Sequence, residues 1–171
     1  MSSSSRLIVA EIPRLRRYAR VLTRDREAAD DLVQDCLERA WSRFHLWRRR
    51  DNLRAWLFTI MHNLHANHVR RAKSRPVTTS IDLSDVSQRL PSIRPAQEDG
   101  LETRGLAAAL DQLPDEQRAV LVLVALEQFS YEEAARVLDI PIGTVMSRLS
   151  RARDRLRRQL AGPTAAEGGR S

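Results

Sequence analysis

Residues 130–156 read SYEEAARVLDIPIGTVMSRLSRARDRL, and this stretch decides the fold of the C-terminal part of the chain. Ser130 is followed three residues later by Glu133. This is the spacing of a capping box, in which each side chain accepts a hydrogen bond from the backbone N–H of the other residue. The two bonds satisfy donors that otherwise lack a partner at a helix N-terminus. A helix is therefore predicted to begin at about Tyr131.

A tight turn and a second helix follow. Asp139 and Pro141 break the helical pattern, and Asp139 is expected in the left-handed region because aspartate tolerates a positive φ better than most residues. The next helix is predicted to run from about Ile142 to about Gln159, because apolar residues return at helical spacing. Its buried stripe is predicted to consist of Val145, Leu149, Ala152 and Leu156.

The opposite face of this second helix is rich in arginine. It contains Ser147, Arg148, Arg151, Arg155 and Arg158, with Arg153 and Arg157 at its margins. A planar guanidinium can donate two parallel hydrogen bonds to a phosphate or to guanine. Alone, such a stripe could be a solvated amphipathic face. After a capped helix and a tight turn, it indicates a helix-turn-helix that reads DNA.

Composition favours helices and a polyanionic partner. Of the 171 residues 42% are hydrophobic but only 5% aromatic, and the net charge is +7. We predict an all-α fold of two small helical domains joined by a linker. Residues 1–76 hold 17 Lys or Arg against 8 Asp or Glu, whereas residues 77–102 hold 2 against 5. The predicted linker is therefore acidic between basic neighbours.

The chain is expected to work in the cytoplasm, without membrane insertion. Cys36 is the only cysteine, so no internal disulfide can form, and it is expected to be a small buried residue. No apolar stretch is long enough to span a bilayer, and the N-terminus lacks the apolar core of a signal peptide.

Composition shifts divide the chain into four parts. Residues 1–72 are predicted to form one helical domain, 73–105 an acidic flexible linker, 106–160 the helix-turn-helix domain and 161–171 a disordered tail.

The N-terminal domain is predicted to contain several helices. Pro13 is expected to interrupt or start a helix, Asp25 to cap the second helix, and a third helix to run from Leu53 to about Arg71. The second helix is expected to bury Ala29, Leu32, Val33, Cys36, Leu37, Ala40 and Trp41. The third is expected to bury Trp56, Leu57, Ile60, Leu64 and Val69.

Two blocks of sequence resemble a known family. Residues 31–35 (DLVQD), 39–41 (RAW) and 52–60 (NLRAWLFTI) followed by Asn63 resemble region 2 of bacterial sigma-70 factors, and residues 141–153 resemble region 4. Their order, with an acidic linker between them, is similar to the minimal sigma factors of the extracytoplasmic function (ECF) group. The run PIGTVMSRL looks most like the general-stress type of that group.

The resemblance implies a transcription initiation factor that is not an enzyme and uses no cofactor or metal. Region 2 would bind the clamp helices of the polymerase β′ subunit and open the −10 promoter element. Region 4 would bind the β flap and read the −35 element. An anti-sigma protein is a further expected partner. The sequence leaves open whether the two domains pack together; the acidic linker between basic domains suggests that they do, with the linker shielding one basic face.

The residues implied for each role are carried over by position. Those that meet the polymerase are Asp31, Gln34, Asp35 and Glu38. Those at the −10 element are Arg48, Arg49, Arg50, Asp51, Asn52, Asn63, Asn67, Arg70 and Arg71. Those at the −35 element are Thr144, Ser147, Arg148, Arg151, Arg153 and Arg155. Two positions depart from the family pattern: Met146 stands where a basic residue is frequent, and Ser150 where many relatives carry a bulkier one.

Three other functions compete with this interpretation. His62, His65 and His68 could hold a metal in a hydrolase, but no carboxylate or cysteine joins them at a familiar spacing. A one-component helix-turn-helix regulator would leave the acidic second helix unexplained. A sigma-like decoy that only binds an anti-sigma protein would be expected to lose the arginines of its last helix, which this chain retains.

Overall fold

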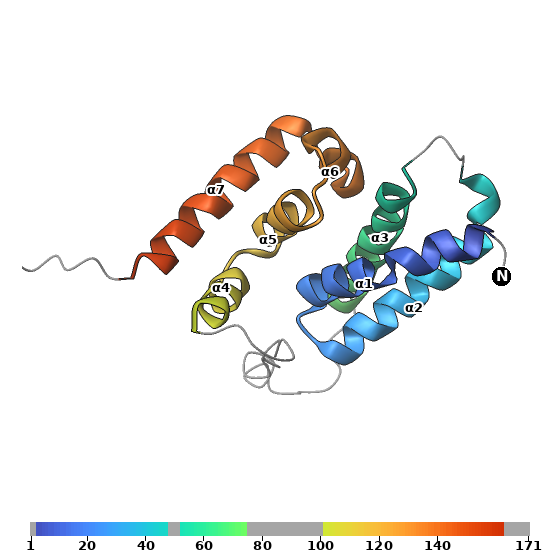
Figure 1. Cartoon of the computed structure of the whole chain (residues 1–171), viewed down its shortest axis with the longest axis horizontal. Helices are drawn as coiled ribbons and strands as arrows, with labels where there is room; N and C mark the ends of the chain where they lie inside the picture. Colours follow the sequence, from blue (N-terminus) through green and yellow to red (C-terminus); the bar gives the residue numbers. More distant parts are fainter. Residues whose placement is uncertain (1–2, 48–51, 75–100, 163–171) are drawn as a thin grey trace, which may run out of the picture.

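The computed structural model describes residues 3–47, 52–74 and 101–162 (Figure 1). Within these ranges every regular element is helical, which confirms the predicted all-α class. The elements are α1 (Ser3–Thr23), α2 (Arg26–Ser42), the 3-10 turn η1 (Phe44–Leu46), α3 (Leu53–Ser74), α4 (Leu101–Asp111), α5 (Asp115–Leu121), the π-helical turn η2 (Val122–Leu126), α6 (Tyr131–Leu138) and α7 (Ile142–Leu160).

The first three helices form the N-terminal half. After α1, Arg24 adopts a positive φ of 57° and the chain reverses, so that α2 returns along α1 (Figure 1). The carboxylate of Asp25 accepts a 3.1 Å hydrogen bond from the backbone N–H of Ala28, which confirms the predicted cap. Cys36 is buried, as predicted.

The prediction that Pro13 interrupts or starts a helix is wrong. Helix α1 passes through Pro13, although proline removes one backbone hydrogen bond. Pro13 is exposed, whereas Ile8 before it and Leu15 after it are fully buried. Packing on both sides of the proline therefore holds the helix together across the missing bond.

The helix-turn-helix is confirmed in detail. Ser130 Oγ accepts a 3.1 Å hydrogen bond from the backbone N–H of Glu133, and Glu133 Oε2 accepts one of 2.9 Å from the backbone N–H of Ser130. Asp139 lies in the left-handed region with φ of 53°. Helix α7 then begins at Ile142, and it buries Val145, Leu149 and Ala152.

Helical structure extends into both ends of the predicted linker. Helix α3 continues to Ser74 and α4 begins at Leu101, whereas the linker was predicted over residues 73–105. Residues 75–100, and with them the proposed shielding of a basic face, lie outside the described residues. The predicted tail does so too from residue 163 onward.

Two expected core residues lie at the surface instead. Trp41 is 52% exposed, because it is rotated by about 120° from the centre of the buried stripe of α2 at 100° per residue. Val69 is 38% exposed, in the last turns of α3, where its neighbours along the helix are also exposed. Trp56 is half-buried against the core, as expected.

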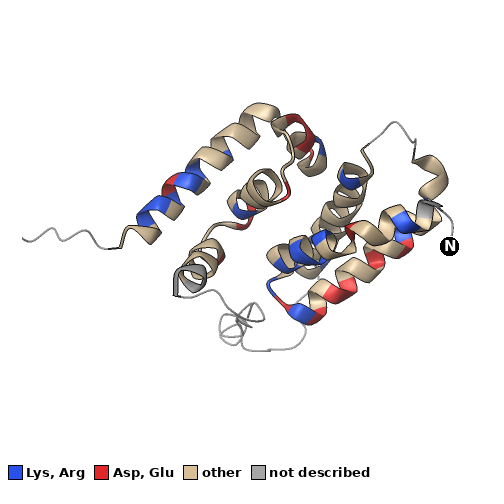
Figure 2. Cartoon of the chain, in the orientation of Figure 1, with Lys and Arg blue, Asp and Glu red and all other residues tan. Residues whose placement is uncertain are grey.

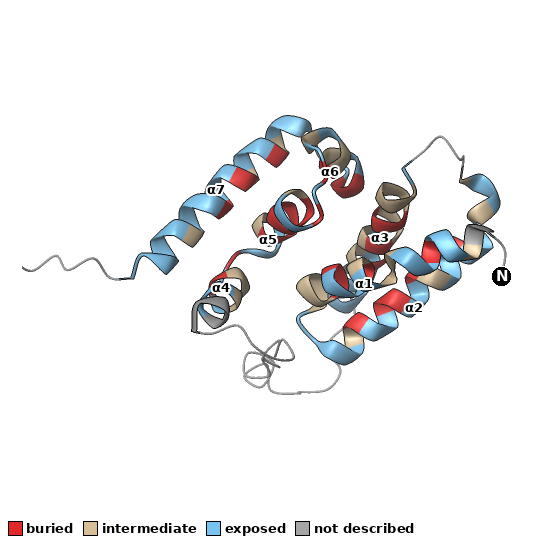
Figure 3. Ribbon diagram, viewed as in Figure 1, coloured by how far each residue is buried: buried red, intermediate tan, exposed pale blue. Residues whose placement is uncertain are grey.

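The two halves of the chain share one hydrophobic core. Helix α3 packs against α6, and α1 packs against α5. Phe58 of α3 and Phe129 before α6 meet edge to face, with ring centroids 5.1 Å apart. Figure 3 marks buried positions, in red, on the helices of both halves. The two halves therefore pack against each other, an arrangement that the sequence left open.

A buried arginine also joins the halves. Arg118 of α5 is only 2% exposed, and its Nε donates a 3.2 Å hydrogen bond to the backbone carbonyl of Val21 in α1. Its Nη1 donates to the carbonyl of Leu113 over 3.2 Å, and Nη2 pairs with Asp115. This guanidinium therefore satisfies backbone acceptors on both sides of the interface.

Candidate polymerase and nucleic-acid interfaces

The four residues predicted to meet the polymerase form one exposed stripe on α2. Asp31, Gln34, Asp35 and Glu38 follow the spacing of a single helix face, and all four are exposed. Asp35 Oδ2 lies 3.7 Å from Nε2 of His68, and Gln34 donates to Glu38 over 3.4 Å. Figure 2 shows acidic residues, in red, along the ribbon of α2. The structure therefore brings these residues together on a surface open to a partner.

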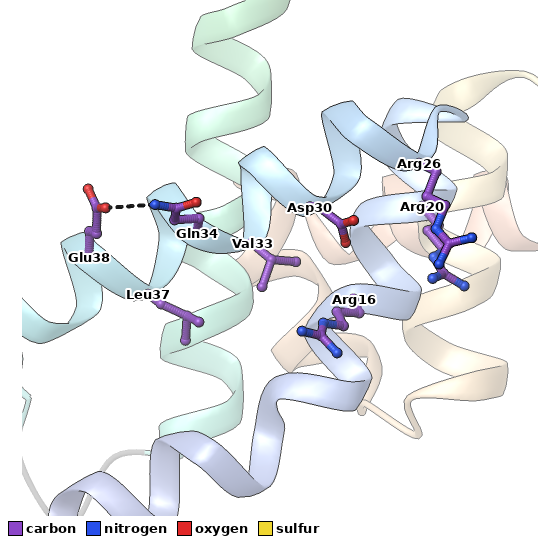
Figure 4. A pocket seen from close by; sticks show the side chains of 8 residues that line it. All are labelled: Arg16, Arg20, Arg26, Asp30, Val33, Gln34, Leu37 and Glu38. Atoms are coloured by element: carbon purple, nitrogen blue, oxygen red, sulfur yellow. Dashed lines mark hydrogen bonds between the residues drawn. The ribbon is translucent and has the colours of Figure 1, made fainter.

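A groove between α1 and α2 borders the acidic stripe (Figure 4). It has a volume of about 500 Å³. Its lining residues are Arg16, Arg20, Arg26, Asp30, Val33, Gln34, Leu37 and Glu38. The cations were missed by sequence reasoning, although the spacing of Arg16 and Arg20 places them on one face of α1. The surface next to Gln34 therefore carries both signs of charge.

Three residues predicted for the −10 element converge on one groove. Asn63, Asn67 and Arg70 of α3 line a pocket of about 350 Å³. Arg39 of α2 and Arg43, the residue directly after α2, line the same pocket. These two arginines were missed, although Arg39 belongs to the RAW block. Amide groups for base edges and cations for phosphates are the groups that a binding site for single-stranded DNA requires.

Asn52 has a structural task in addition to its predicted one. Its Oδ1 accepts hydrogen bonds from the backbone N–H groups of Arg54 (3.1 Å) and Ala55 (3.3 Å), so it caps α3. Its Nδ2 donates a 2.7 Å hydrogen bond to Oε1 of Glu133 in α6. Arg48, Arg49, Arg50 and Asp51 lie outside the described residues, and Arg71 is exposed beside Arg70.

On α7 the predicted −35 residues divide between two flanks. Ser147, Arg151, Arg153 and Arg155 are exposed, and Thr144 is half-buried. Arg151 and Arg155 share a flank with Thr144, whereas Arg153 lies about 160° away from Arg151 at 100° per residue. Asp154 stands between the arginines, 3.6 Å from Nη1 of Arg157. The basic surface of α7 is therefore broader than one stripe.

Arg148 differs from the other arginines of α7 because it turns toward the protein. Its side chain is 23% exposed, and its Nη2 lies 3.3 Å from Oε2 of Glu116 in α5. It also lines a cavity of about 410 Å³ between the two halves, together with His62 and His65 of α3. In this arrangement Arg148 is paired within the protein.

Burial lowers the pKa of two histidines of α3, His62 and His65. Burial, with contributions from His65 and Arg148, lowers the pKa of His62 to about 4. Burial likewise lowers the pKa of His65. Among the described residues, no group of three or more His, Cys, Asp or Glu side chains is arranged to hold a metal ion. No helix in the same ranges is both long and apolar enough to cross a membrane.

Comparison with protein families matches both halves. Residues 8–62 match the family model described as the sigma2 domain of PhyR, and residues 103–156 match sigma-70, region 4. The chain is 42% identical to the ECF RNA polymerase sigma factor EcfG of Rhodopseudomonas palustris, over 87% of this chain and 80% of the relative. It is 36% identical to the ECF RNA polymerase sigma factor SigM of Mycobacterium tuberculosis, over 85% and 71%.

Solved structures agree with these matches. The sigma factor RpoE of Bartonella quintana, crystallised with the anti-sigma factor NepR, superposes with a TM-score of 0.76 at 32% identity, covering 94% of this chain and 98% of RpoE. CnrH, solved with the cytosolic domain of CnrY, gives 0.65 at 25% identity, covering 94% and 89%. An all-α pair of regions with an acidic α2 and an arginine-rich helix-turn-helix defines a sigma-70-type factor. The chain belongs to the ECF RNA polymerase sigma factors, and it directs transcription initiation at promoters.

Proposed function

We propose that three separate surfaces divide the work of promoter recognition. The acidic stripe of α2 docks on core RNA polymerase at the β′ clamp helices, the groove between α2 and α3 holds the −10 strand, and α7 reads the −35 element, with the helix-turn-helix region also resting on the β flap. The observation that carries this proposal is the convergence of Asn63, Asn67 and Arg70 with Arg39 and Arg43 on one groove.

The chemistry of each surface suits its proposed partner. Carboxylates on α2 complement a basic surface and favour fast, oriented docking. In the −10 groove, the arginines would track the phosphates while the asparagines bind the edges of unpaired bases. On α7, exposed guanidinium groups can bind phosphate or guanine in the major groove. These residue roles are proposals that follow from placement and chemistry.

The test is reconstitution of the protein with bacterial core RNA polymerase on a fragmented genomic library, followed by sequencing of the transcripts. Discrete start sites with shared upstream elements are expected. A failure to bind core polymerase and to give transcripts would overturn the proposal.

The −10 assignment has its own control. Asn63→Ala is expected to reduce transcription from duplex promoters and to recover when the −10 region is supplied as a premelted bubble. Arg151→Ala should not recover on that template, because its defect lies at the −35 element. A loss for Asn63→Ala that is equal on both templates would contradict a role in opening the duplex and would assign Asn63 only to holding unpaired bases.

We further propose that the protein acts in the cytoplasm and catalyses no reaction of its own. No cofactor is needed, because the work consists of binding and strand separation, which binding energy alone can drive. The half-buried His62 and His65 are explained by packing at the boundary between the two halves. A hydrolase activity that depends on these histidines would contradict this.

An anti-sigma protein is the proposed regulator. Supporting this, RpoE was solved with the anti-sigma factor NepR and CnrH with the cytosolic domain of CnrY, and each match covers 94% of this chain. The resemblance of residues 141–149 supports assignment to the general-stress type. Co-purification of the tagged protein from stressed and unstressed cells would test both, with release of the partner expected under stress.

One observation favours a second candidate, a sigma-like decoy. The N-terminal half matches the family model of the sigma2 domain of PhyR. Against it, α7 retains exposed Arg151, Arg153 and Arg155. Binding to core polymerase or to an anti-sigma protein without any transcription in the reconstituted assay would favour the decoy.

A further inference from the structure

The first two turns of α7 expose apolar side chains where DNA-reading helices make their base contacts. Met146 is 49% exposed and Ile142, one turn earlier, is 39% exposed. The remaining large apolar residues of this helix are buried or half-buried until its last residue, Leu160. Single exposed apolar residues are common on protein surfaces and need no explanation. Ile142 and Met146, two such residues one turn apart in the N-terminal turns of α7, suggest a more specific role.

Met146 belongs to one continuous exposed face. Met146, Ser147, Ser150 and Arg151 are all exposed and follow the spacing i, i+1, i+4 and i+5, which places them side by side. The buried residue Val145 fixes the rotation of the helix from the opposite side. Ser147 is held close to its own backbone, because its Oγ donates a 3.1 Å hydrogen bond to the carbonyl of Thr144. On this face Met146 and Arg151 are therefore the two long side chains.

Met146 and Arg151 differ in which groups on the edge of a base they can contact. Arg151 can donate hydrogen bonds to guanine or phosphate, whereas the thioether of Met146 offers no donor and is only a weak acceptor. In the major groove the apolar group available to such a side chain is the 5-methyl group of thymine. The methionine side chain is unbranched and flexible, so it can adjust to the position of such a methyl group.

We propose that Met146 is a specificity-determining residue that selects thymine in the −35 element through contact with its 5-methyl group. The inference rests on the proposed function of α7 as the −35 reader. Ile142 forms the apolar flank of the same contact. Relatives with a basic residue at this position would lack this selection.

The test uses the reconstituted holoenzyme and a change in the DNA that removes only the methyl group. After the −35 element has been defined from the transcripts of the wild-type protein, each thymidine in it is replaced in turn by deoxyuridine. At one position the replacement is expected to weaken promoter binding by the wild-type holoenzyme about fourfold, the value of one buried methyl group. In Met146→Ala the same replacement should have no effect, and the two changes together should cost no more than either alone.

Leu160→Ala is the matched control, since Leu160 is an equally exposed apolar residue at the far end of the same helix. This variant should retain the fourfold effect of deoxyuridine. If no thymidine is sensitive, or if Met146→Ala is as sensitive as wild type, the assignment of Met146 is overturned while promoter recognition by the protein still stands. If the wild-type holoenzyme selects no promoter at all, the −35 function fails and the inference fails with it.

Discussion

Glu127 and Arg17 form an ion pair across the boundary between the two halves of the chain, with 2.7 Å between Nε of Arg17 and Oε1 of Glu127. The glutamate side chain is fully buried, whereas that of Arg17 is half exposed. The other carboxylate oxygen of Glu127 has no hydrogen-bond partner within the described part of the chain. The π-helical turn η2 places this residue, because the backbone N–H of Glu127 donates to the carbonyl of Val122, five residues earlier.

This asymmetry predicts unequal effects of removing either partner. Arg17→Ala leaves a buried carboxylate without its cation, and we expect the free energy of unfolding to fall by about 2 to 3 kcal/mol. Glu127→Gln leaves Arg17 free to reach water and should cost less. The measurement is chemical denaturation of both variants and of the double variant. The glutamine substitution should rescue part of the loss caused by Arg17→Ala, and a purely additive result would contradict the pairing.

The capping box predicts a second stability effect. Ser130→Ala removes one acceptor at the start of α6 and should reduce the free energy of unfolding by about 1 kcal/mol. Glu133→Ala should cost more, because the carboxylate serves both the backbone N–H of Ser130 and the side chain of Asn52. Ser147→Ala on α7 is the control, since its hydroxyl only binds its own helix. Equal stability of all three variants would contradict the role of the box.

Glu133 also makes stability depend on acidity at low pH. The hydrogen bond from the backbone of Ser130, followed by those from Asn52 and the Ser130 hydroxyl, lowers the pKa of Glu133 below its ordinary value of 4.5. Its contribution is therefore complete above pH 4.5 and is lost as the pH falls through the lower pKa of the folded state. Glu133→Gln should flatten the dependence in that range.

His62 predicts a separate dependence at higher pH. Its pKa is about 4 in the folded protein against 6.5 ordinarily, so the folded state binds fewer protons than the unfolded state between these values. Stability should therefore rise with pH from about 4 to 6.5 and then level off, by about 3 kcal/mol in total. His62→Gln should remove most of this slope in denaturation measured at several pH values. His45→Gln, on the exposed turn η1, is the control, and an unchanged slope in His62→Gln would contradict the argument.

At the −35 element, Arg151→Ala is expected to weaken promoter binding by about 1 to 3 kcal/mol if Arg151 contacts a base. Arg148→Ala should weaken promoter binding less than Arg151→Ala does, because Arg148 is paired with Glu116 in this arrangement. Binding of the holoenzyme to matched and mismatched −35 sequences measures the difference. A loss for Arg151→Ala that is equal on every sequence would assign this residue to phosphate instead.

Local chemistry made the helix-turn-helix predictable. The capping box, the left-handed Asp139 and the buried stripe of α7 each depend on residues a few positions apart, so the sequence contains the whole interaction. The same holds for the exposed stripe of α2, where helical spacing alone determines which residues share a face. Trp41 shows the limit: it was expected in the core, yet it lies about 120° from the centre of the buried stripe of α2 and is exposed.

Interactions between distant residues could not be predicted. Arg17 and Glu127 are 110 positions apart, and nothing near either residue indicates a buried pair. The same is true of Arg118, which the structure buries and whose Nε donates to the carbonyl of Val21, 97 positions earlier. The turn of Arg148 toward Glu116 likewise depends on how α5 packs beside α7.

The core shared through Phe58 and Phe129 has a consequence for every ligand of this protein. A ligand that binds only when the halves are apart must first break this contact, so its apparent affinity is reduced by the fraction of molecules in which the halves have separated. A ligand that bridges the closed halves meets no such reduction. The strength of this internal contact therefore sets the relative apparent affinities of competing partners. A stronger contact weakens every partner that needs the halves apart, even when the partners bind different surfaces.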